Sequence, residues 1–161
     1  MRVEPPGIDE ADAIADAWVA LAADQQSYDS YLLSEENRAT ARESVCRSIV
    51  TGGMLVARTE ADDIAGFVQF SVESGAYETS VRKGLVENLF VAPDQRDRGV
   101  GSELLEAAES ALVADGAETV VLDVMADNEA ARRFYRRHGY DQHRITMLKD
   151  VETDIPPGEN D

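Results

Sequence analysis

Two arginines and two glycines lie close together in the stretch from Arg96 to Ser102. Gly99 and Gly101 carry no Cβ, so the backbone there can approach a ligand closely. An apolar segment precedes the stretch and helically spaced residues follow it, which places Val100, Gly101 and Ser102 at the start of a helix. The first N–H groups and the dipole of a helix favour an anion there, and Arg96 and Arg98 add positive charge. The chemistry indicated is the binding of a phosphate.

Familiar phosphate-binding sequences do not fit this stretch. A P-loop requires G-x-x-x-x-G-K followed by Ser or Thr, and the chain has no such run. The dinucleotide fingerprint G-x-G-x-x-G begins at Gly99 and Gly101, but Leu104 stands where its third glycine should be. Taken alone, the stretch is equally consistent with a strand-to-helix turn whose glycines only relieve strain.

Three further side chains could take part in chemistry. Tyr135 carries a phenol, which with an ordinary pKa of about 10 is protonated at neutral pH and can donate a proton; it could also simply pack beside Phe134. Asn128 precedes a predicted helix and is by default a cap. Glu87 is expected to share one strand face with Leu85, Leu89 and Val91, so its carboxylate is either solvated near an edge or partly buried with a raised pKa.

Hydrophobic periodicity predicts alternating strands and helices that position these residues. Met54–Arg58 and Ile64–Val72 should form an antiparallel hairpin, and the continuously apolar segment Thr119–Met125 a central strand covered on both sides. The other predicted strands are Met1–Val3, Leu85–Val91 and a final pair within Tyr140–Val151. Four helices are predicted. The first follows Asp9, the second follows Ser34 and ends at Gly52, and the other two span Gly99–Asp115 and Asn128–His138.

Two of these stretches together resemble a known family. The sequence from Asn128 to Tyr140 matches the pattern N-x-x-A-x-x-[LF]-Y-x-x-x-G-[FY], and Arg96, Gly99 and Gly101 match R-x-x-G-x-G after the strand Glu87–Val91. In this order and separation the motifs resemble the GCN5-related N-acetyltransferase (GNAT) superfamily. They cover the second half of the chain, and the first half agrees only in its order of elements.

The resemblance implies a mixed α/β (α+β) fold. Its mostly antiparallel sheet would have about six or seven strands and about four flanking helices, and would splay open between two central parallel strands. It implies direct transfer of an acetyl group from acetyl-CoA to an amine, which could be a small amine, an amino acid derivative or a protein amino group. A regulatory module of the same fold that binds acyl-CoA without turnover is the alternative.

The resemblance also assigns residues to the cofactor. The backbone of Leu89 and Val91 would pair with the pantetheine arm, the amide of Leu89 or Phe90 would polarise the thioester, and the amides from Arg98 to Ser102 would hold the pyrophosphate. Asn128 would lie near the cofactor arm. Tyr135 would be the general acid at the sulfur, and Glu87, directly or through a water, is the candidate base. Some polyamine-acetylating relatives carry Glu-Asp where this chain has Glu87-Asn88, which argues against a polycationic acceptor.

Composition limits the remaining possibilities. The formal net charge is -17, from 32 acidic and 15 basic residues, so the surface should repel nucleic acid and anionic membranes and neither is expected as a partner. Only Lys83 and Lys149 are lysines, and this with the acid excess suggests a halophilic source with a salt-rich cytoplasm. The chain has no signal peptide or membrane-spanning run, which predicts a cytoplasmic location.

We expect a single domain over residues 1–151, followed by an acidic tail over 152–161. His138 and His143 lack a nearby cysteine cluster, so no metal site is assigned. The sequence does not fix the oligomeric state, although many members of the family that it resembles form homodimers.

Overall fold

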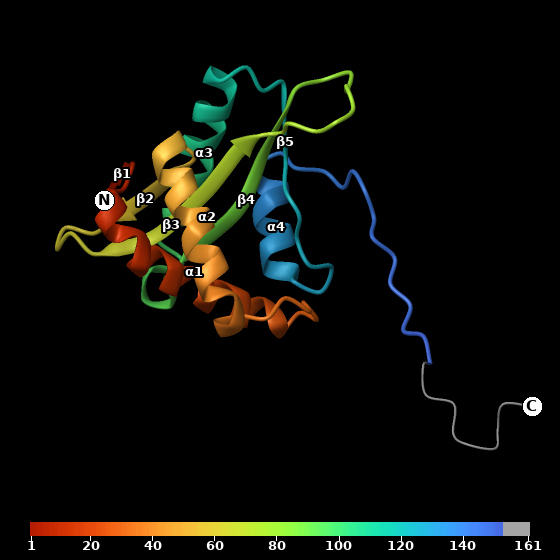
Figure 1. Cartoon of the computed structure of the whole chain (residues 1–161), viewed down its shortest axis with the longest axis horizontal. Coiled ribbons are helices and arrows are strands. Elements are labelled where there is room, and N and C mark those ends of the chain that lie inside the picture. Colours follow the sequence, from red (N-terminus) through yellow and green to blue (C-terminus); the bar gives the residue numbers. More distant parts are fainter. Residues whose placement is uncertain (153–161) are drawn as a thin grey trace, which may run out of the picture. The chain divides into compact units, whose positions relative to one another are not determined.

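The computed structural model describes residues 1–152. The chain divides into two compact units, Met1–Asn128 and Glu129–Asp161. Within the described residues, the first unit holds a five-stranded sheet and the helices α1 to α3, and the second holds the helix α4 (Figure 1). A single domain over 1–151 stays a prediction, and the predicted tail, apart from Glu152, lies outside the described residues.

The sheet has the strand order β1-β2-β3-β4-β5. Neighbouring strands from β1 to β4 pair antiparallel, and β4 pairs with β5 in parallel. The predicted hairpin is confirmed, because β2 and β3 pair directly. The strands are β1 (Arg2–Glu4), β2 (Met54–Arg58), β3 (Ile64–Val72), β4 (Lys83–Val91) and β5 (Thr119–Val121).

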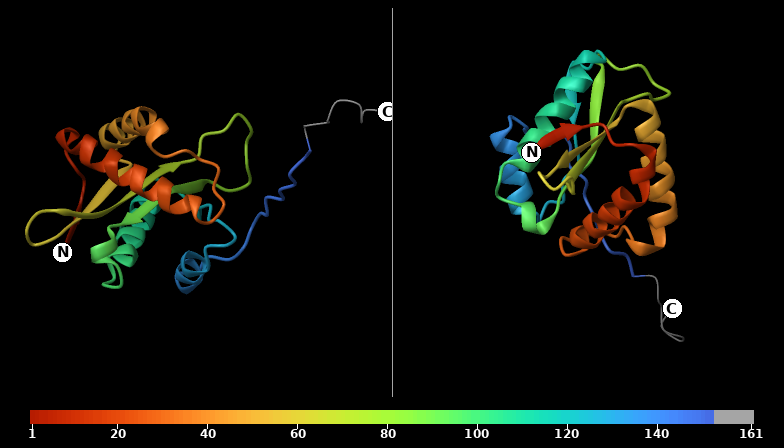
Figure 2. Two further views of the ribbon diagram at one scale, coloured as in Figure 1. Left: turned by 90° about the horizontal axis from the view of Figure 1, so that it is seen from below. Right: turned by 90° about the vertical axis from the view of Figure 1, so that its left-hand side faces the viewer.

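Three helices cover the two faces of this sheet. The helices α1 (Ala11–Gln26) and α2 (Arg38–Thr51) lie on one face, and α3 (Val100–Ala114) lies on the other (Figure 2). The predicted stop of α2 is confirmed, since Gly52 takes a left-handed φ of 85° that suits glycine. Of the helices in the described part of the chain, none combines the length and the apolar character that crossing a membrane needs.

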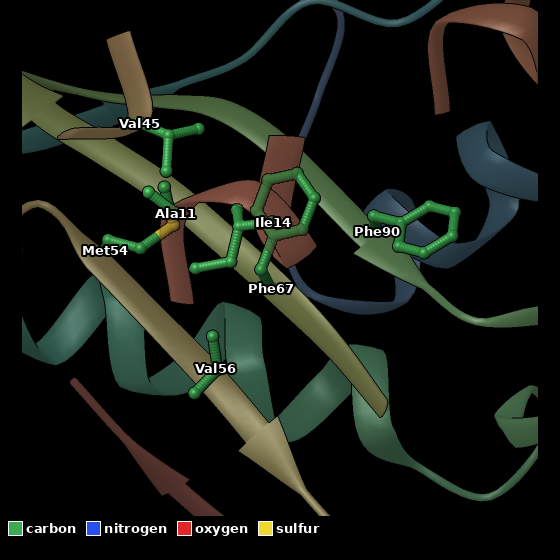
Figure 3. Packing of buried hydrophobic residues seen from close by; sticks show 7 residues of the cluster. All are labelled: Ala11, Ile14, Val45, Met54, Val56, Phe67 and Phe90. Carbon is green, nitrogen blue, oxygen red and sulfur yellow. The ribbon is translucent and has the colours of Figure 1, made fainter. Parts of the chain in front are cut away.

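The core between the sheet and the α1 and α2 layer is built from seven buried residues (Figure 3). Phe67 of β3 and Phe90 of β4 pack with ring centroids 6.0 Å apart, and Ile14 of α1 is fully buried in the same cluster. Each such side chain contributes roughly 1.5–3 kcal/mol through burial. The other members are Ala11, Val45, Met54 and Val56. The cluster therefore holds α1, α2 and the strands β2 to β4 together.

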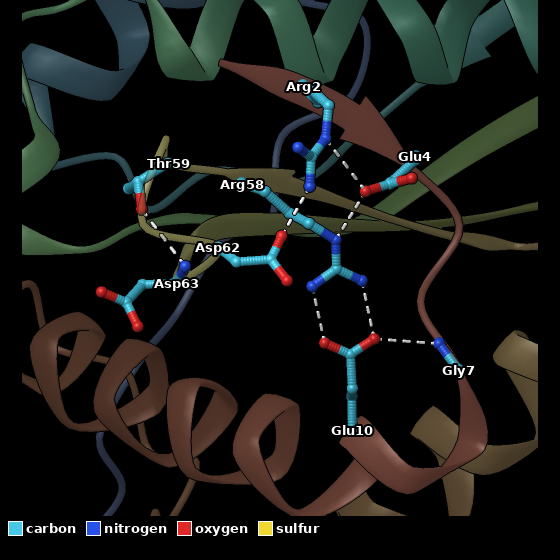
Figure 4. A network of polar contacts seen from close by, with 8 residues as sticks. All are labelled: Arg2, Glu4, Gly7, Glu10, Arg58, Thr59, Asp62 and Asp63. Carbon is cyan, nitrogen blue, oxygen red and sulfur yellow. Dashed lines mark hydrogen bonds and ion pairs between the residues drawn. The ribbon is translucent and has the colours of Figure 1, made fainter.

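A charged network closes the β1 end of the sheet (Figure 4). Arg58 of β2 donates two hydrogen bonds of 2.7 Å to Glu10 at the start of α1, and a third of 2.7 Å to Glu4 of β1. The Arg58 side chain is only 11% exposed. The same Glu10 accepts a hydrogen bond from the Gly7 amide, and its hydrogen bond to Arg58 lowers its pKa from 4.5. This fork between a guanidinium and a carboxylate joins α1 to the sheet.

The predicted strand count is too high. The described residues after α4, up to Glu152, contain no strand, so the final pair predicted within Tyr140–Val151 is absent and five strands remain rather than six or seven. The segment predicted as a central strand, Thr119–Met125, forms only the short β5 at the end of the sheet. A central strand needs a partner on each edge, and β5 pairs only with β4. The parallel pair consequently lies at the edge of the sheet rather than at its centre.

Candidate functional site

The strand β4 is paired along its whole length on one side and only at its beginning on the other. Its partner β3 matches it from Gly84 to Val91, whereas β5 matches only Lys83, Gly84 and Leu85. No strand of the described residues pairs with β4 from Val86 to Val91 on the β5 side. The parallel pairing therefore ends at Leu85, where β5 ends at Val121, and β4 has an open edge beyond it.

Hydrogen bonding shows which backbone groups lie along this open edge. The Ala92 amide donates a hydrogen bond of 2.8 Å to the Ala65 carbonyl, just beyond the start of the β3–β4 pairing. From Ala92 back along β4, residues whose amide and carbonyl bond β3 therefore alternate with residues whose amide and carbonyl do not. By this alternation Phe90 bonds β3, and the amides and carbonyls of Leu89 and Val91 point away from it. The strand can thus offer the Leu89 amide and carbonyl and the Val91 amide to an extended ligand, as it would to another strand, while the Val91 carbonyl accepts a hydrogen bond from Arg96.

A β-bulge interrupts β4 at Glu87. Asn88 pairs with Gln69 while Val86 pairs with Phe70, so Glu87 is an extra residue without a counterpart on β3. Glu87 was predicted to share a face with Leu85, Leu89 and Val91, and this prediction is wrong. The bulge shifts the alternation, because strict alternation holds only while the register is unbroken.

The faces of β4 follow from its partners on β3. Residues directly opposite each other project to the same face, so Asn88 lies with Gln69 on the α1 and α2 side. Val91 lies opposite Gly66, where an added Cβ would meet Leu104 of α3 at 3.2 Å, so Val91 and Leu89 belong to the α3 side. Glu87 itself is exposed. Its carboxylate is therefore reachable from solvent.

The stretch from Arg96 to Ser102, the glycine turn, leads from the end of β4 at Val91 into α3. Its backbone takes left-handed conformations at Asp97 (φ 62°) and Gly99 (φ 80°), and α3 begins at Val100. The Glu103 amide makes the first bond into the helix, to the Gly99 carbonyl over 3.1 Å. The amides of Val100 and Gly101 precede that bond, and the N-cap residue, Gly99, has no side chain that could cap the terminus. Nothing within 4 Å would meet a Cβ at Gly99, so its left-handed φ is what calls for glycine there.

The two arginines of the turn differ in their surroundings. The Nε atom of Arg96 donates to the Val91 carbonyl over 3.0 Å, and Nη2 lies 3.7 Å from Asp24 near the end of α1. Arg96 is therefore held beside the open edge of β4. Arg98 instead lines a cavity of about 550 Å³ next to the β2–β3 turn, whose other lining residues include Asp63 and Asp94.

In the second unit, α4 (Glu129–Arg137) carries Tyr135, directly after Asn128 closes the first unit. The Tyr135 ring contacts Phe134 edge-on, with centroids 5.2 Å apart, and lies 5.9 Å from Tyr140. Burial raises the pKa of Tyr135 to about 12, because a charged phenolate would lose its hydration. The phenol is thus neutral throughout the neutral pH range.

The structure brings most of the predicted residues of the first unit together. Glu87, Leu89, Phe90 and Val91 occupy the open half of β4, and the glycine turn follows directly. The sequence did not single out Gln69, a 3% exposed polar residue in the buried middle of β3. A polar residue inside an apolar run was the signal available for it. The described residues contain no group of three or more His, Cys, Asp or Glu side chains that could hold a metal ion.

The chain matches a family profile over most of its length. Residues 16–140 match the profile described as the acetyltransferase (GNAT) family. The mycothiol acetyltransferase of Clavibacter sepedonicus is 35% identical over 130 residues, which are 78% of this chain and 39% of that protein. The aminoalkylphosphonate N-acetyltransferase of Salmonella typhimurium is 36% identical over 66 residues, 41% of this chain and 43% of that protein. The chain spans less than half the length of these curated relatives.

Solved structures share the fold at low sequence identity. A variant of the BH1408 protein from Bacillus halodurans is 16% identical, with a TM-score of 0.83 over 94% of this chain and 100% of that one. A GCN5-related N-acetyltransferase from Ralstonia eutropha is 20% identical, with a TM-score of 0.73 over 93% of this chain and 97% of that one. At these identities the likeness extends to the fold alone.

Proposed function

The chain belongs to the acetyltransferase (GNAT) family, and from this premise we propose that it transfers an acetyl group from acetyl-CoA to the nitrogen of an amine. One observation carries the proposal. The open edge of β4, from Val86 to Val91, leads directly into the turn whose amides begin α3. Such an arrangement offers hydrogen bonds to an extended amide-containing arm and, next to them, a site for an anion.

The residues present fit coenzyme A. The backbone of Leu89 and Val91 would bind the pantetheine arm, and the amide of Leu89 or Phe90 would polarise the thioester carbonyl. The pyrophosphate would be held by the turn and the first turn of α3, which comprise Arg96, Arg98, Gly99, Val100, Gly101 and Ser102. Asn128, the last residue of the first unit, and Tyr135 of α4 are each also proposed to contact coenzyme A. Support comes from the left-handed φ at Gly99 and from the position of this glycine as the N-cap of α3.

Acetyl-CoA supplies a thioester carbonyl, at which a neutral amine nitrogen forms the new C–N bond while the C–S bond breaks. The ammonium proton has to leave before attack, and the exposed carboxylate of Glu87, directly or through a water, would accept it. The departing thiolate needs a proton, which the Tyr135 hydroxyl would donate. The raised pKa of Tyr135, about 12, keeps this proton in place at neutral pH. The second proton, which the nitrogen loses as the amide forms, would pass to water, and the phenol would regain its proton from solvent.

The acceptor is proposed only as a class. The names of the relatives refer to mycothiol, to an aminoalkylphosphonate and to N-alpha-acetylation, so similar sequences carry names that refer to different compounds or groups. A small amine, an amino acid derivative or a protein amino group each fits the proposal. The α1–α2 connection exposes Tyr31, Leu32 and Leu33, whose apolar side chains are available for contacts with an acceptor.

Acceptor-dependent release of CoA thiol from acetyl-CoA tests the proposal. The full chain would be assayed with a panel of amines in molar salt, with each acetylated product identified by mass. We expect one thiol released for each amide formed. Saturable binding of acetyl-CoA with no acceptor-dependent thiol release from a broad panel would instead support the alternative, a regulatory module that binds acyl-CoA without turnover.

We also propose that the protein works in the salt-rich cytoplasm of a halophile, either as a monomer or as a homodimer. The support is the net charge of -17 in a chain with only two lysines. Strong salt screens repulsion between like charges and so stabilises a compact acidic protein. We expect the melting temperature to rise between low and molar sodium chloride. A flat or falling melting temperature would contradict the halophilic origin.

A further inference from the structure

A line of hydrogen-bonded side chains crosses from α2 through β3 to β4. The Nε2 atom of Gln69 donates to Ser44 over 3.0 Å and to Ser48 over 2.8 Å, both on α2. Its Oε1 atom accepts a hydrogen bond from Asn88 Nδ2 over 2.9 Å. Both hydrogens of the Gln69 amide are thus used. Reversing this amide alone would bring its NH2 group against that of Asn88, so the network fixes its orientation.

Packing alone does not require this network. Gln69 is 3% exposed and lies between Val68 and Phe70, two buried apolar residues. An apolar side chain of similar size would fill the same space without the risk of an unpaired buried amide. What the polar residue adds is direction, because it holds the Asn88 side chain in one orientation.

Asn88 presents its remaining acceptor to solvent. Its Nδ2 group is bound to Gln69, whereas its Oδ1 atom has no hydrogen-bond partner among residues 1–152. Every buried side-chain nitrogen and oxygen of those residues has a partner, so Oδ1 is accessible. Asn88 follows the bulge residue Glu87 and precedes Leu89, whose backbone lies on the open edge. The accessible oxygen is therefore beside the proposed site of the thioester.

The two faces of the sheet separate two approaches to β4. The turn proposed to bind pyrophosphate begins α3 on one face, and Asn88 belongs to the face covered by α1 and α2. An acceptor reaching β4 from the α1 and α2 side would meet Asn88 without crossing the anion site.

We propose that Asn88 Oδ1 accepts a hydrogen bond from the acceptor amine and that Gln69 is the positioning residue that orients it. This assignment rests on the proposed acetyl transfer. An amide oxygen binds an N–H group, but it carries no charge that would stabilise an ammonium as a carboxylate does. Asn88 therefore holds the amine without raising its pKa, so that more of it is in the neutral, nucleophilic form than beside a carboxylate. The position favours monoamines over polycations.

Three substitutions test the assignment. For Asn88→Ala we expect the KM of the amine to rise about tenfold, because one hydrogen bond is lost. For Asn88→Asp we expect the pH dependence of kcat to move to higher pH, because the new carboxylate raises the pKa of the bound amine. Gln69→Leu should raise the KM of the amine as Asn88→Ala does. The dissociation constant of acetyl-CoA, measured without amine, should stay within about twofold in all three.

Gln142→Ala, at an exposed position of the second unit, serves as the matched control and should change none of these values. Melting temperatures report whether each variant is folded. An unchanged amine KM in Asn88→Ala, or an equal loss of acetyl-CoA affinity, would overturn the assignment and leave the network a purely structural role. Absence of turnover by the unsubstituted protein with every amine is a different result, which would overturn the proposed function and this assignment with it.

Discussion

The two ends of the sheet differ in how completely their strands are paired. At the β1 end, β1 matches β2 along its length and Arg58 joins the strands to α1 through Glu4 and Glu10. At the β5 end, only Lys83, Gly84 and Leu85 of the long strand β4 have partners on β5. The β1 end is therefore the closed end of the sheet, held by charge-assisted hydrogen bonds. The β5 end is the open end, where β4 leaves backbone donors and acceptors available.

This difference separates stability from function. Substitutions at the closed end should change the free energy of unfolding and leave chemistry alone, whereas substitutions at the open end should change binding or turnover and leave the fold intact. The buried Phe67 and Phe90 pair spans β3 and β4, so the open edge rests on a rigid core. Preorganised backbone groups of this kind bind a ligand without the cost of ordering a flexible strand.

The largest expected effect is on turnover, through Tyr135 of the second unit. Tyr135→Phe removes the proposed proton donor and should lower kcat about 100-fold, the usual scale of general acid catalysis, with acetyl-CoA affinity nearly unchanged. Tyr77→Phe is the matched control, because Tyr77 is 90% exposed on the β3–β4 loop. Steady-state rates and equilibrium binding measure the two quantities. An unchanged kcat would remove Tyr135 from the mechanism and leave the open end to work without it.

Next in size is the effect of Gly101→Phe on cofactor affinity. A bulky side chain in the first turn of α3 would obstruct a pyrophosphate at the helix terminus, and we expect acetyl-CoA to bind about 30-fold more weakly. Binding titration measures this, and Gly75→Phe in the exposed β3–β4 loop is the control. Unaltered affinity in a folded Gly101→Phe protein would exclude the glycine turn as the pyrophosphate site.

Glu87→Gln should have a smaller effect. The amide keeps the size of the side chain but cannot accept the ammonium proton, so kcat/KM at neutral pH should fall about tenfold for a protonated amine. The deficit should shrink at high pH, where the amine is already neutral. Rates as a function of pH measure it, with Glu60→Gln on the exposed β2–β3 turn as control. A deficit that is absent at every pH would leave Glu87 as a solvated residue of the bulge.

The smallest effect on activity is expected at the closed end. Glu10→Gln weakens the fork with Arg58 and should lower the free energy of unfolding by about 1–2 kcal/mol at pH 7, with kcat unchanged. Because Arg58 lowers the Glu10 pKa from 4.5 in the folded state, this stabilisation is present above pH 4.5 and is lost as the pH falls through the folded value. Urea unfolding from pH 7 downward should show the two proteins converging. Parallel curves, or a loss of kcat, would contradict the division between the two ends.

Local sequence patterns predicted the structural features that depend on residues close together in the chain. The hairpin of β2 and β3 and the helix α3 follow from apolar periodicity, and the end of α2 follows from the glycine at position 52. Sequence patterns did not predict the features that depend on how strands pair with one another. The apolar run Thr119–Met125 could not reveal that β5 would have one neighbour, nor could alternation reveal the bulge at Glu87.

The same limit applies to the candidate site. The motif residues could be named from the sequence, because glycines, arginines and a tyrosine at fixed spacing carry a recognisable pattern. Gln69 and Ser48 could not be connected with Asn88, since their contact depends on the register of β3 and on the packing of α2. Residues that act through other residues leave no local pattern.

Amide hydrogen exchange at Leu89 and Val91 tests the central claim most directly, namely that acetyl-CoA binds along the open edge of β4. With saturating acetyl-CoA, both amides should exchange at least about tenfold more slowly, because the pantetheine arm would accept or cover their hydrogens, while the amides of β2 at the closed end should not change. If acetyl-CoA binds saturably and the amides of Leu89 and Val91 exchange at the same rate as in the free protein, the cofactor does not lie on this edge and the account is wrong.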